Sequence, residues 1–355
     1  MSFEKCEDYS EEDLEKEPEV DGRIKIDKET EKRLRKAGYG VYNHSTIEIC
    51  HWQEKALEGE RGCYKVKFYG IEALRCMQFS PAGMFCQNRC VYCWRPTEFY
   101  KTLKLDENKV DEPEEIFENL LKEWKRLLTG FGGNPKVNRK VFEYVFNNYP
   151  SHYAISLSGE PTMYPKLPKL IKFLKSLPST KSVFLVTNGQ EPEMLEKLQK
   201  EDALPTQLYL SMNAADPETF KKVNVPLYKD AWERWNKSLE FLSRANCRTV
   251  IRITLIRSLN YDKSKIPLWA ELIKKGNPHF IEIKSYMHLG LSTKRLKRED
   301  MLKHEEVKEW AFELLKYLPN FEYMDEDERS RIVVLQNKER YVNRWIIPKK
   351  EISSK

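Results

Sequence analysis

The sequence predicts an α/β protein whose core is a partial barrel of six strand–helix units. Short β-rich apolar runs alternate along the chain with amphipathic stretches, which is typical of parallel strands joined by right-handed crossovers. Six to seven units are too few for a closed eight-fold barrel, so an open or partial barrel fits best. The length of 355 residues and the apolar content of 40% suffice for one such core. The expected strands are 74–79, 153–157, 182–186, 207–211, 249–255 and 280–285.

The expected helices begin with a short charged helix at 28–38, which ends at Gly38. The clearest helix is 113–128 (PEEIFENLLKEWKRLL), because its apolar residues recur at helical spacing on one face. Further helices are expected at 163–177, 191–200, 230–245, 263–275 and 301–317.

Composition divides the chain into four segments. Residues 1–22 carry ten acidic and two basic side chains, which predicts a disordered acidic head. An N-terminal extension follows at 23–72, then the barrel at 73–325 and a basic extension at 326–355. Beyond the head the net charge is +14, which is compatible with a polyanionic partner. The sequence shows no secretory signal and no apolar run that could span a membrane, so we expect a cytoplasmic protein with reduced thiols.

Polar residues follow the end of each expected strand, where barrel enzymes carry their chemistry. A cysteine-rich loop follows the first strand and SGEPT (158–162) follows the second. The later strands are followed by TNG (187–189), SMN (211–213), RSLN (257–260) and the segment 284–288. The active site is therefore expected at the carboxyl ends of the strands.

Six of the eight cysteines lie between positions 50 and 93 and form two patterns. The tight C-x3-C-x2-C pattern (Cys86, Cys90, Cys93) can supply three thiolates to a [4Fe–4S] cluster and leave one iron open to a substrate-like ligand. A structural zinc site would require four ligands, usually in paired C-x2-C units. A disulfide framework is typical of small secreted chains. The iron–sulfur interpretation is therefore favoured.

The triplet, with Tyr92 just before its last cysteine, resembles the radical S-adenosylmethionine (SAM) superfamily. Ser158-Gly159-Glu160-Pro161-Thr162 is similar to the Gly-Gly-Glu-Pro element of that superfamily, with Ser in place of the first Gly. The resemblance implies that SAM binds the open iron and contacts the neighbouring strand ends. The expected contacts are Tyr92, Ser158, Gly159, Glu160, Asn188, Ser211 and Asn213. Core packing remains an alternative for Tyr92, as strand-end capping does for Ser211 and Asn213.

The first three cysteines, Cys50, Cys63 and Cys76, have twelve residues between neighbours and precede the triplet. Both patterns in this order, over about residues 40–325, resemble the 4-demethylwyosine synthase family of tRNA wybutosine biosynthesis. The resemblance implies a second [4Fe–4S] cluster on the first set. It also implies that a 5′-deoxyadenosyl radical drives the condensation of pyruvate carbons with N1-methylguanosine beside the anticodon of tRNA-Phe. This chain is similar to the short archaeal form, so it requires an external electron donor of flavodoxin or ferredoxin type.

In that family a lysine two residues after the middle cysteine is proposed to form a Schiff base with pyruvate, and that position here is Lys65. Lys67 would serve if the register differed, and a solvated surface lysine is the alternative for Lys65. Pyruvate can bind the iron, the lysine or both.

Two alternative functions and the RNA contacts remain open from the sequence. The alternatives are another two-cluster radical-SAM catalyst, such as a glycyl-radical activase or a methylthiotransferase, and an iron–sulfur or zinc RNA-binding protein without catalysis. Candidate RNA contacts are the segments 129–140, 294–298 and 337–350, which mix basic with aromatic or flexible residues. Cys6 and Cys247 are expected to be bystanders.

Overall fold

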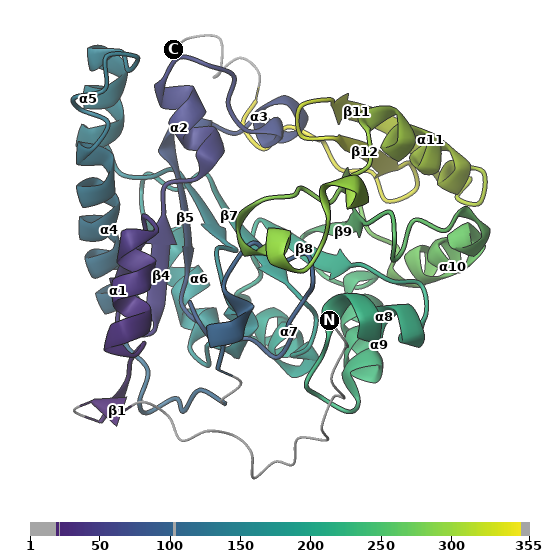
Figure 1. Ribbon diagram of the computed structural model, residues 1–355, viewed down its shortest axis with the longest axis horizontal. Helices are drawn as coiled ribbons and strands as arrows, with labels where there is room; N and C mark the ends of the chain where they lie inside the picture. The colour runs from purple at the N-terminus through teal and green to yellow at the C-terminus, as the bar shows by residue number, and fades with distance from the viewer. Residues whose placement is uncertain (1–18, 21, 102–103, 349–355) are drawn as a thin grey trace.

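The computed structural model describes residues 19–20, 22–101 and 104–348 (Figure 1). Most of the acidic head, including Cys6, lies outside the described residues. Within them, no helix combines the length and the apolar character that a bilayer crossing requires. All seven described cysteines are free thiols.

A single mixed sheet forms the centre of the molecule. Its ten strands lie in the order β11-β12-β10-β9-β8-β7-β6-β5-β4-β3. The inner six are parallel and follow chain order: β5 (Cys76–Ser80), β6 (His152–Ile155), β7 (Ser182–Thr187), β8 (Gln207–Met212), β9 (Arg248–Leu255) and β10 (Phe280–Ser285). Each parallel strand pairs with the next in sequence, as in a singly wound barrel, and the sheet ends in antiparallel edges. The predicted partial (βα)6 barrel is confirmed.

Helices connect the parallel strands, and most of them lie close to where the periodicity predicts them. Proline stands in the first turn of several of them, where its fixed φ suits a helix start and its missing N–H costs nothing. The helices are α1 (Lys28–Lys36), α4 (Pro113–Thr129), α5 (Arg139–Asn147), α6 (Leu167–Ser176), α7 (Pro192–Lys200), α8 (Pro217–Asn224), α9 (Ala231–Leu242), α10 (Ile266–Gly276) and α11 (His304–Leu315).

Two antiparallel hairpins extend the parallel core at its edges. β3 (Gly40–Tyr42) and β4 (Ser45–Glu48) pair with β5, and β11 (Phe321–Asp327) and β12 (Ile332–Asn337) pair with β10. The boundary expected after residue 325 falls inside β11, so the start of the basic extension belongs to the barrel sheet. The first expected strand also begins later, because Ala73–Arg75 forms a 3-10 turn before Cys76.

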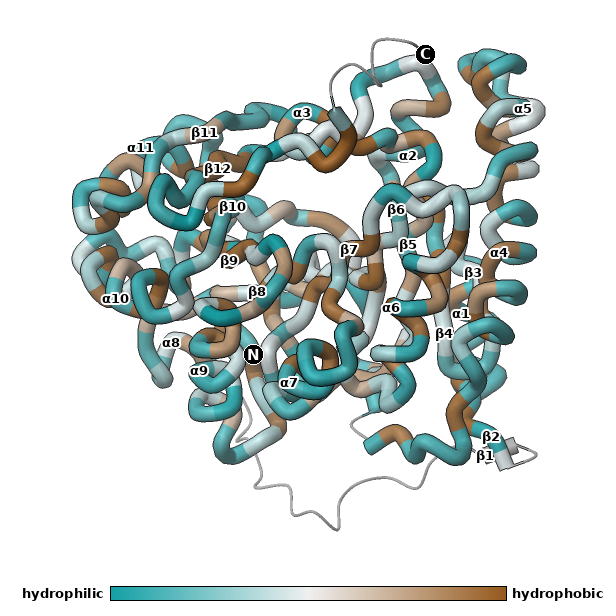
Figure 2. Tube along the Cα trace, turned by 180° about the vertical axis from the view of Figure 1, so that it is seen from behind, coloured by the Kyte–Doolittle hydropathy of each residue, from teal (hydrophilic) through white to brown (hydrophobic). Residues whose placement is uncertain are grey.

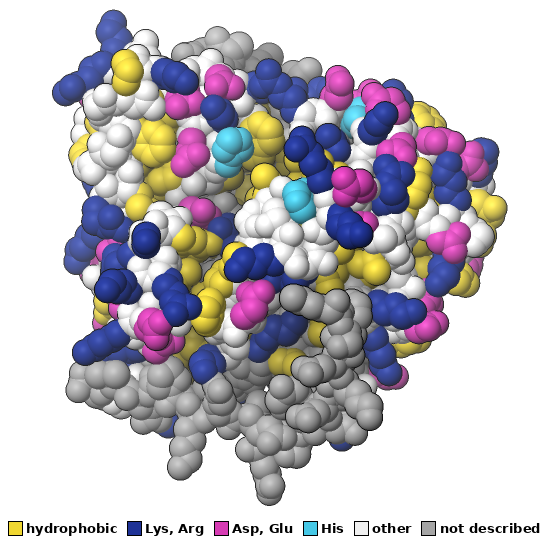
Figure 3. Space-filling view, in the orientation of Figure 1, with side chains coloured by type: hydrophobic (Ala, Val, Ile, Leu, Met, Phe, Trp, Pro, Cys, Tyr) yellow, Lys and Arg dark blue, Asp and Glu magenta, His cyan; other side chains and the backbone are white. Residues whose placement is uncertain are grey.

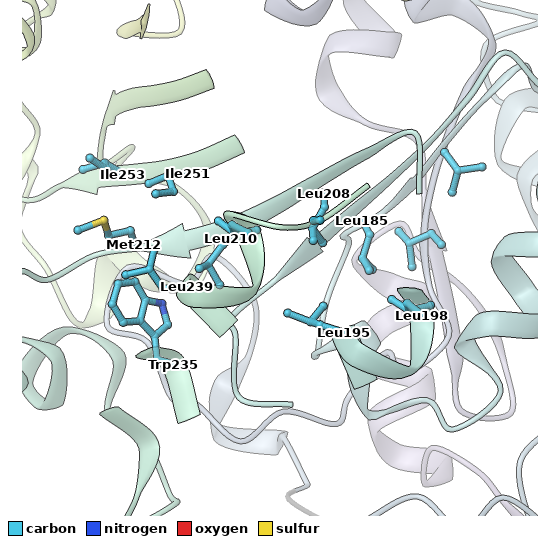
Figure 4. Close-up of a cluster of buried hydrophobic side chains, with 14 of the residues drawn as sticks. Leu185, Leu195, Leu198, Leu208, Leu210, Met212, Trp235, Leu239, Ile251 and Ile253 are labelled. Carbon is cyan, nitrogen blue, oxygen red and sulfur yellow. The ribbon is translucent and has the colours of Figure 1, made fainter. Parts of the chain in front are cut away.

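The two faces of the parallel sheet differ in chemistry because strand side chains alternate between them. The outward face is apolar and packs against the helices, as Figure 4 shows for Leu185, Leu208, Leu210, Ile251 and Ile253 against residues of α7 and α9. In Figure 2 the brown, apolar stretches accordingly run along the central strands and the inner sides of the helices. The inward face carries polar and charged residues, among them Cys76, Tyr209, Arg252 and Glu282.

Two short helices of the N-terminal extension, α2 (His51–Leu57) and α3 (Tyr64–Tyr69), lie at one end of the barrel (Figure 1). Tyr64, Phe68 and Tyr69 of α3 pack with inward-facing aromatic residues of the sheet, including Tyr209. The segment after β12 returns over α3, where Ile346 N–H bonds Tyr69 C=O at 2.8 Å. The N-terminal extension thus covers the inward face of the barrel.

Candidate functional site

The loop that carries Cys86, Cys90 and Cys93 follows the carboxyl end of β5, as the sequence predicts. Its backbone bonds that of the α8 end, with Val91 N–H to Val223 C=O at 3.0 Å. The Arg295 guanidinium donates to the carbonyls of Val91, at 3.2 Å, and Cys93. These bonds hold the three thiols on one short stretch of backbone at the barrel mouth.

The three thiols interact electrostatically with one another. Burial, followed by the charge of neighbouring thiols, raises the pKa of Cys90 to about 12 and that of Cys86 well above its ordinary value. Among the described residues, no three His, Cys, Asp or Glu side chains lie close enough together to hold a single metal ion. A [4Fe–4S] core is larger than a single ion and keeps its thiolates farther apart. Three thiols on one loop are the donor set that a [4Fe–4S] cluster with one open iron takes from the protein.

Glu160 follows β6 and is 2% exposed. Its Oε1 accepts hydrogen bonds from Thr187 Oγ1 at 2.7 Å and from Thr162 Oγ1 at 2.6 Å, whereas Oε2 accepts one, from Asn188 N–H at 2.7 Å. Burial raises the pKa of this carboxyl, although these hydrogen bonds oppose the shift. Oε2 keeps lone-pair capacity for a further hydrogen-bond donor, while Oε1 is occupied by the chain.

Gly159 occupies a backbone position that suits only glycine. Its φ is +66°, and a Cβ there would lie 1.8 Å from Ala82 C=O and 2.6 Å from Phe85 C=O. The adjacent Glu160 N–H donates to that Phe85 carbonyl at 2.7 Å. The element 158–162 is therefore joined backbone to backbone with the start of the cysteine loop.

Tyr92 and Asn213 meet beside the cysteine loop. Asn213 Nδ2 donates to Tyr92 Oη at 2.8 Å and to Asn224 Oδ1 at 3.1 Å. Its Oδ1 is buried and has no hydrogen-bond partner among the described residues. Cys90 Sγ donates to the same Asn224 Oδ1 at 3.7 Å. An unpartnered buried acceptor beside the thiols fits a polar ligand that carries hydroxyl or ammonium donors, and SAM carries both.

The other expected SAM contacts differ in their burial and in the hydrogen bonds that their side chains already make. Asn188 Nδ2 lies 3.6 Å from Cys86 Sγ, at the edge of the thiol site. Ser211 is half-buried on the inward face of β8, in register with Arg252. Ser158 is buried, donates to Gly83 C=O at 2.6 Å and bonds Thr46 Oγ1 at 3.0 Å. The Ser158 hydroxyl thus holds the chain together, and its contact with SAM stays a prediction.

Cys50, Cys63 and Cys76 come from three separate elements. Cys50 and Cys63 immediately precede α2 and α3, and Cys76 is the first residue of β5. Burial, followed by the charge of neighbouring thiols, raises the pKa of Cys50 to about 11 and that of Cys76 to about 12. The second thiol set therefore forms only in the folded chain. The two sets lie toward opposite ends of β5, whose five residues span about 13 Å.

Lys65 points into the barrel from α3. Its Nζ lies 4.5 Å from the ring centre of Phe184 and 4.9 Å from that of Tyr209, both on the inward face. Burial, followed by repulsion from Arg252, lowers the pKa of this amine, although Cys63 and Glu282 oppose the shift. Within the described residues Nζ makes no hydrogen bond or ion pair. Lys65 is thus held between aromatic rings and not at the surface.

Lys67, the alternative lysine, faces away from the barrel. Its side chain is 45% exposed, and its Nζ lies 2.8 Å from Asp325 Oδ1. Two residues further along a short helix reverse the side-chain direction, so only Lys65 reaches the inward face. The structure separates the two candidates that the sequence left open.

Arg252 and Glu282 are inward-facing residues that the sequence analysis missed, whereas Lys284 belongs to the expected polar segment 284–288. Arg252 and Glu282 pair across β9 and β10, with Nε 3.1 Å from Oε2. Lys284 follows two positions later, on the same face. The available signal was a charge flanked by apolar residues inside each strand (IRI, IEIK), because an alternating strand turns such a residue to the polar face.

The basic segments expected to contact RNA are partly used within the fold. Arg295 holds the cysteine loop, while Arg344 donates to the carbonyls of Lys67, at 2.7 Å, and Phe68, at 3.1 Å. Residues 349–350 lie outside the described residues; among the described ones, the exposed basic residues of these segments are Lys136, Arg139, Lys140, Lys294, Lys297, Arg298 and Lys338. In Figure 3 the Lys and Arg side chains are spread over the visible face and not gathered in one patch.

A surface hollow of about 260 Å³ lies where the chain leaves β10. Its lining residues are Met287, His288, Leu289, Arg298 and Met301. Leu291 N–H bonds Trp94 C=O of the cysteine loop at 2.9 Å, so the segment that leaves the hollow touches that loop.

Sequence comparisons and solved structures agree with this geometry. Residues 140–266 match the Radical SAM superfamily, and residues 275–337 match a family described as wyosine base formation. The S-adenosyl-L-methionine-dependent tRNA 4-demethylwyosine synthase of Pyrococcus horikoshii is 42% identical over 317 residues, covering 89% of this chain and 91% of that protein. The Methanocaldococcus jannaschii synthase is 39% identical, covering 90% of this chain and 99% of its own length.

A solved structure described as "Structure of TYW1 with a lysine-pyruvate adduct bound" aligns with a TM-score of 0.79 and 38% identity. The alignment covers 90% of this chain and 99% of that chain.

Proposed function

Because the chain belongs to the S-adenosyl-L-methionine-dependent tRNA 4-demethylwyosine synthase family, we propose that it converts N1-methylguanosine beside the anticodon of tRNA-Phe into the tricyclic 4-demethylwyosine base. Two carbons of pyruvate supply the new ring atoms. Family membership favours this activity over another two-cluster catalyst and over an RNA-binding protein without catalysis.

The observation that carries the proposal is the inward position of Lys65. Its amine lies over the rings of Phe184 and Tyr209, and it is close enough to the Cys63 thiol to interact with it electrostatically. A related structure holds a lysine–pyruvate adduct, as its description states. Lys65 lies inside the barrel and near a cysteine set, and it holds the position that the family resemblance assigns to the Schiff base.

We assign Cys86, Cys90 and Cys93 to the cluster that binds SAM, and Cys50, Cys63 and Cys76 to a second [4Fe–4S] cluster. When bound, the first cluster supplies the electron that cleaves SAM and yields the 5′-deoxyadenosyl radical. Glu160 Oε2 accepts a hydrogen bond from the ammonium group of the methionine part of SAM. Asn213 Oδ1 accepts a hydrogen bond from a hydroxyl or ammonium group. Both acceptors have the free capacity that such contacts require.

The chain's own residues prepare Lys65 for attack on pyruvate. The amine must be neutral to act as a nucleophile, and burial lowers its pKa. Its unshared pair forms the bond to the keto carbon, and both amine hydrogens leave with the carbonyl oxygen as water. The Phe184 and Tyr209 rings cover the amine and limit its access to bulk water. Lys65 thereby keeps the substrate inside the barrel, near Cys63.

The reaction also requires the tRNA substrate and an electron donor. The chain beyond residue 22 carries a net charge of +14, which favours contact with phosphates. The target base has to leave its stack, because the thiols that generate the radical lie at the barrel mouth. We propose a cytoplasmic location and an external flavodoxin or ferredoxin as reductant, since reduced thiols and low-potential electrons are available there.

The test is reductive trapping of pyruvate on the reconstituted enzyme. Borohydride should fix a pyruvate adduct on Lys65 in the parent, and mass spectrometry should locate it. Lys65→Ala should lose adduct and product yet still form 5′-deoxyadenosine. Lys65→Arg should fail too, because a guanidinium stays protonated. Lys67→Ala is the matched control and should keep near-parent activity, since that side chain faces solvent.

Iron content tests the cluster assignment on the same proteins. The parent should bind about eight irons, and loss of either cysteine set should halve that number. Product formation by Lys65→Ala at the parent rate, or one zinc and no iron after anaerobic reconstitution, would refute the proposal.

A further inference from the structure

The inward face of β9 and β10 carries an ion pair beside Lys65. Arg252 and Glu282 lie directly opposite each other in the parallel register, and Arg252 Nε donates to Glu282 Oε2 at 3.1 Å. The Glu282 side chain is fully buried, whereas that of Arg252 is 20% exposed toward the barrel interior. Of the two partners, the cation is therefore the one that a ligand can reach.

Side chains of α3 and the sheet fix the Arg252 guanidinium. Its Nη2 donates to Tyr64 Oη at 3.1 Å, and its Cζ lies 4.4 Å from the Tyr209 ring centre. The Glu282 carboxylate accepts from Tyr64 Oη at 3.1 Å and from Tyr69 Oη at 2.8 Å. Arg252 Nη1 makes no hydrogen bond within the part of the chain that the structure describes. The guanidinium is thus held rigidly, and both N–H groups of Nη1 are available to a ligand.

Positive charge exceeds negative charge around this ion pair. Arg252 and Lys284 bring two cationic groups, against the single carboxylate of Glu282. Burial, followed by repulsion from Arg252, lowers the pKa of Lys284 to about 8. Buried cations without partners are costly, so the pocket favours an anion.

A small keto acid suits this arrangement in charge, because both groups lie around one ring and Arg252 is close enough to lower the pKa of Lys65. The Lys65 amine lies 4.9 Å and the Arg252 guanidinium carbon 4.4 Å from the same Tyr209 ring centre. A 2-keto acid carries its carboxylate on the atom next to the carbonyl carbon, so one molecule can meet both groups. The planar fork of Arg suits a carboxylate, which can accept one N–H of Nη1 and the unused N–H of Nη2.

We propose that Arg252 binds the carboxylate of the keto acid whose carbonyl carbon Lys65 attacks, and that Glu282 and Tyr64 are positioning residues for the guanidinium. This inference rests on the proposed function and names the group that selects its substrate. The carboxylate stays ionised and bound to Arg252 while the C–N bond forms and water leaves. Arg252 thereby sets which carbonyl face meets the amine.

The test measures borohydride trapping on Lys65 of the reconstituted protein at increasing pyruvate concentration, with intact-protein mass as the readout. Arg252→Lys keeps the charge beside Glu282 but loses the fork, and we expect its half-saturating pyruvate concentration to rise about 10-fold. For the double variant Arg252→Gln with Glu282→Gln, which removes both charges of the ion pair, we expect a rise of about 10- to 100-fold.

Methyl pyruvate, which lacks the charge, separates carboxylate recognition from general damage. The parent should need far more methyl pyruvate than pyruvate, and this preference should shrink in both Arg252 variants. Arg248→Lys is the matched control, because Arg248 lies on the same face of β9 and bonds Gln207 Oε1 at 2.8 Å. The control should keep the parent's preference. SAM cleavage should persist in all variants, since the thiols at the barrel mouth are untouched.

If pyruvate labels the Arg252 variants at the same half-saturating concentration as the parent, this inference is overturned and the proposed function still stands. Loss of the preference in Arg248→Lys to the same extent would also overturn it, because any inward cation would then suffice. A parent protein that is never labelled on Lys65 would overturn the inference together with the proposed function.

Discussion

Replacing Gly159 by alanine should destabilise the protein and weaken SAM binding together. The backbone at this position has φ of +66°, which costs an L-residue about 1–2 kcal/mol. The new Cβ would lie 1.8 Å from Ala82 C=O, a contact that only a backbone shift can relieve. Overpacking of this kind costs about 1–3 kcal/mol. Together these effects predict a loss of about 2–5 kcal/mol in the free energy of unfolding.

The shift that relieves the clash also explains the expected loss of SAM affinity. It must separate residue 159 from the cysteine loop, so the hydrogen bond from Glu160 N–H to Phe85 C=O lengthens from 2.7 Å. The Glu160 carboxylate then moves relative to Asn188 N–H and the thiols. The measurements are urea unfolding of the purified chain and SAM binding to the reconstituted protein, each compared with the parent.

Gly133→Ala is the matched control, since a Cβ at Gly133 meets nothing within 4 Å. Its unfolding free energy should change by less than about 1 kcal/mol. A Gly159→Ala variant that unfolds within about 0.5 kcal/mol of the parent and binds SAM equally well would refute the reasoning.

Three further predictions concern the tail, a surface ion pair and the tRNA. Arg344→Ala should release the end of α3 and speed amide exchange across Tyr64–Tyr69, because Arg344 bonds two carbonyls there; the exposed Arg329→Ala should leave exchange unchanged. Glu306→Gln should cost about 0.5–1 kcal/mol at pH 7, because the Arg257 hydrogen bond lowers the Glu306 pKa and the pair is partly exposed. A depressed carboxyl pKa stabilises the fold above about pH 4.5, so the difference from the parent in urea unfolding should shrink as pH falls below that value. Affinity for tRNA should fall log-linearly with salt in filter binding; a flat salt profile would count against phosphate contacts.

Local sequence information was enough to predict the frame of the barrel. Alternating apolar runs located all six parallel strands, and 280–285 matches β10 at both ends. The edge hairpins were missed because their strands are stabilised by neighbours far away in the chain, as β12 is by β10. The predicted helices were placed to within a few residues, but α2, α3, α5 and α8 lack a long apolar stripe and were missed.

The sequence alone determined the chemistry at the barrel mouth, because Cys86, Cys90 and Cys93 lie on one loop and Glu160 lies in one short element. Only the tertiary structure decided how the second site is built. Lys65 on α3, Tyr209 on β8 and Arg252 on β9 are up to 187 residues apart and meet because alternating strands turn these side chains to one inward face. No local pattern fixes such a meeting, since the direction of a side chain on a short helix depends on what that helix packs against.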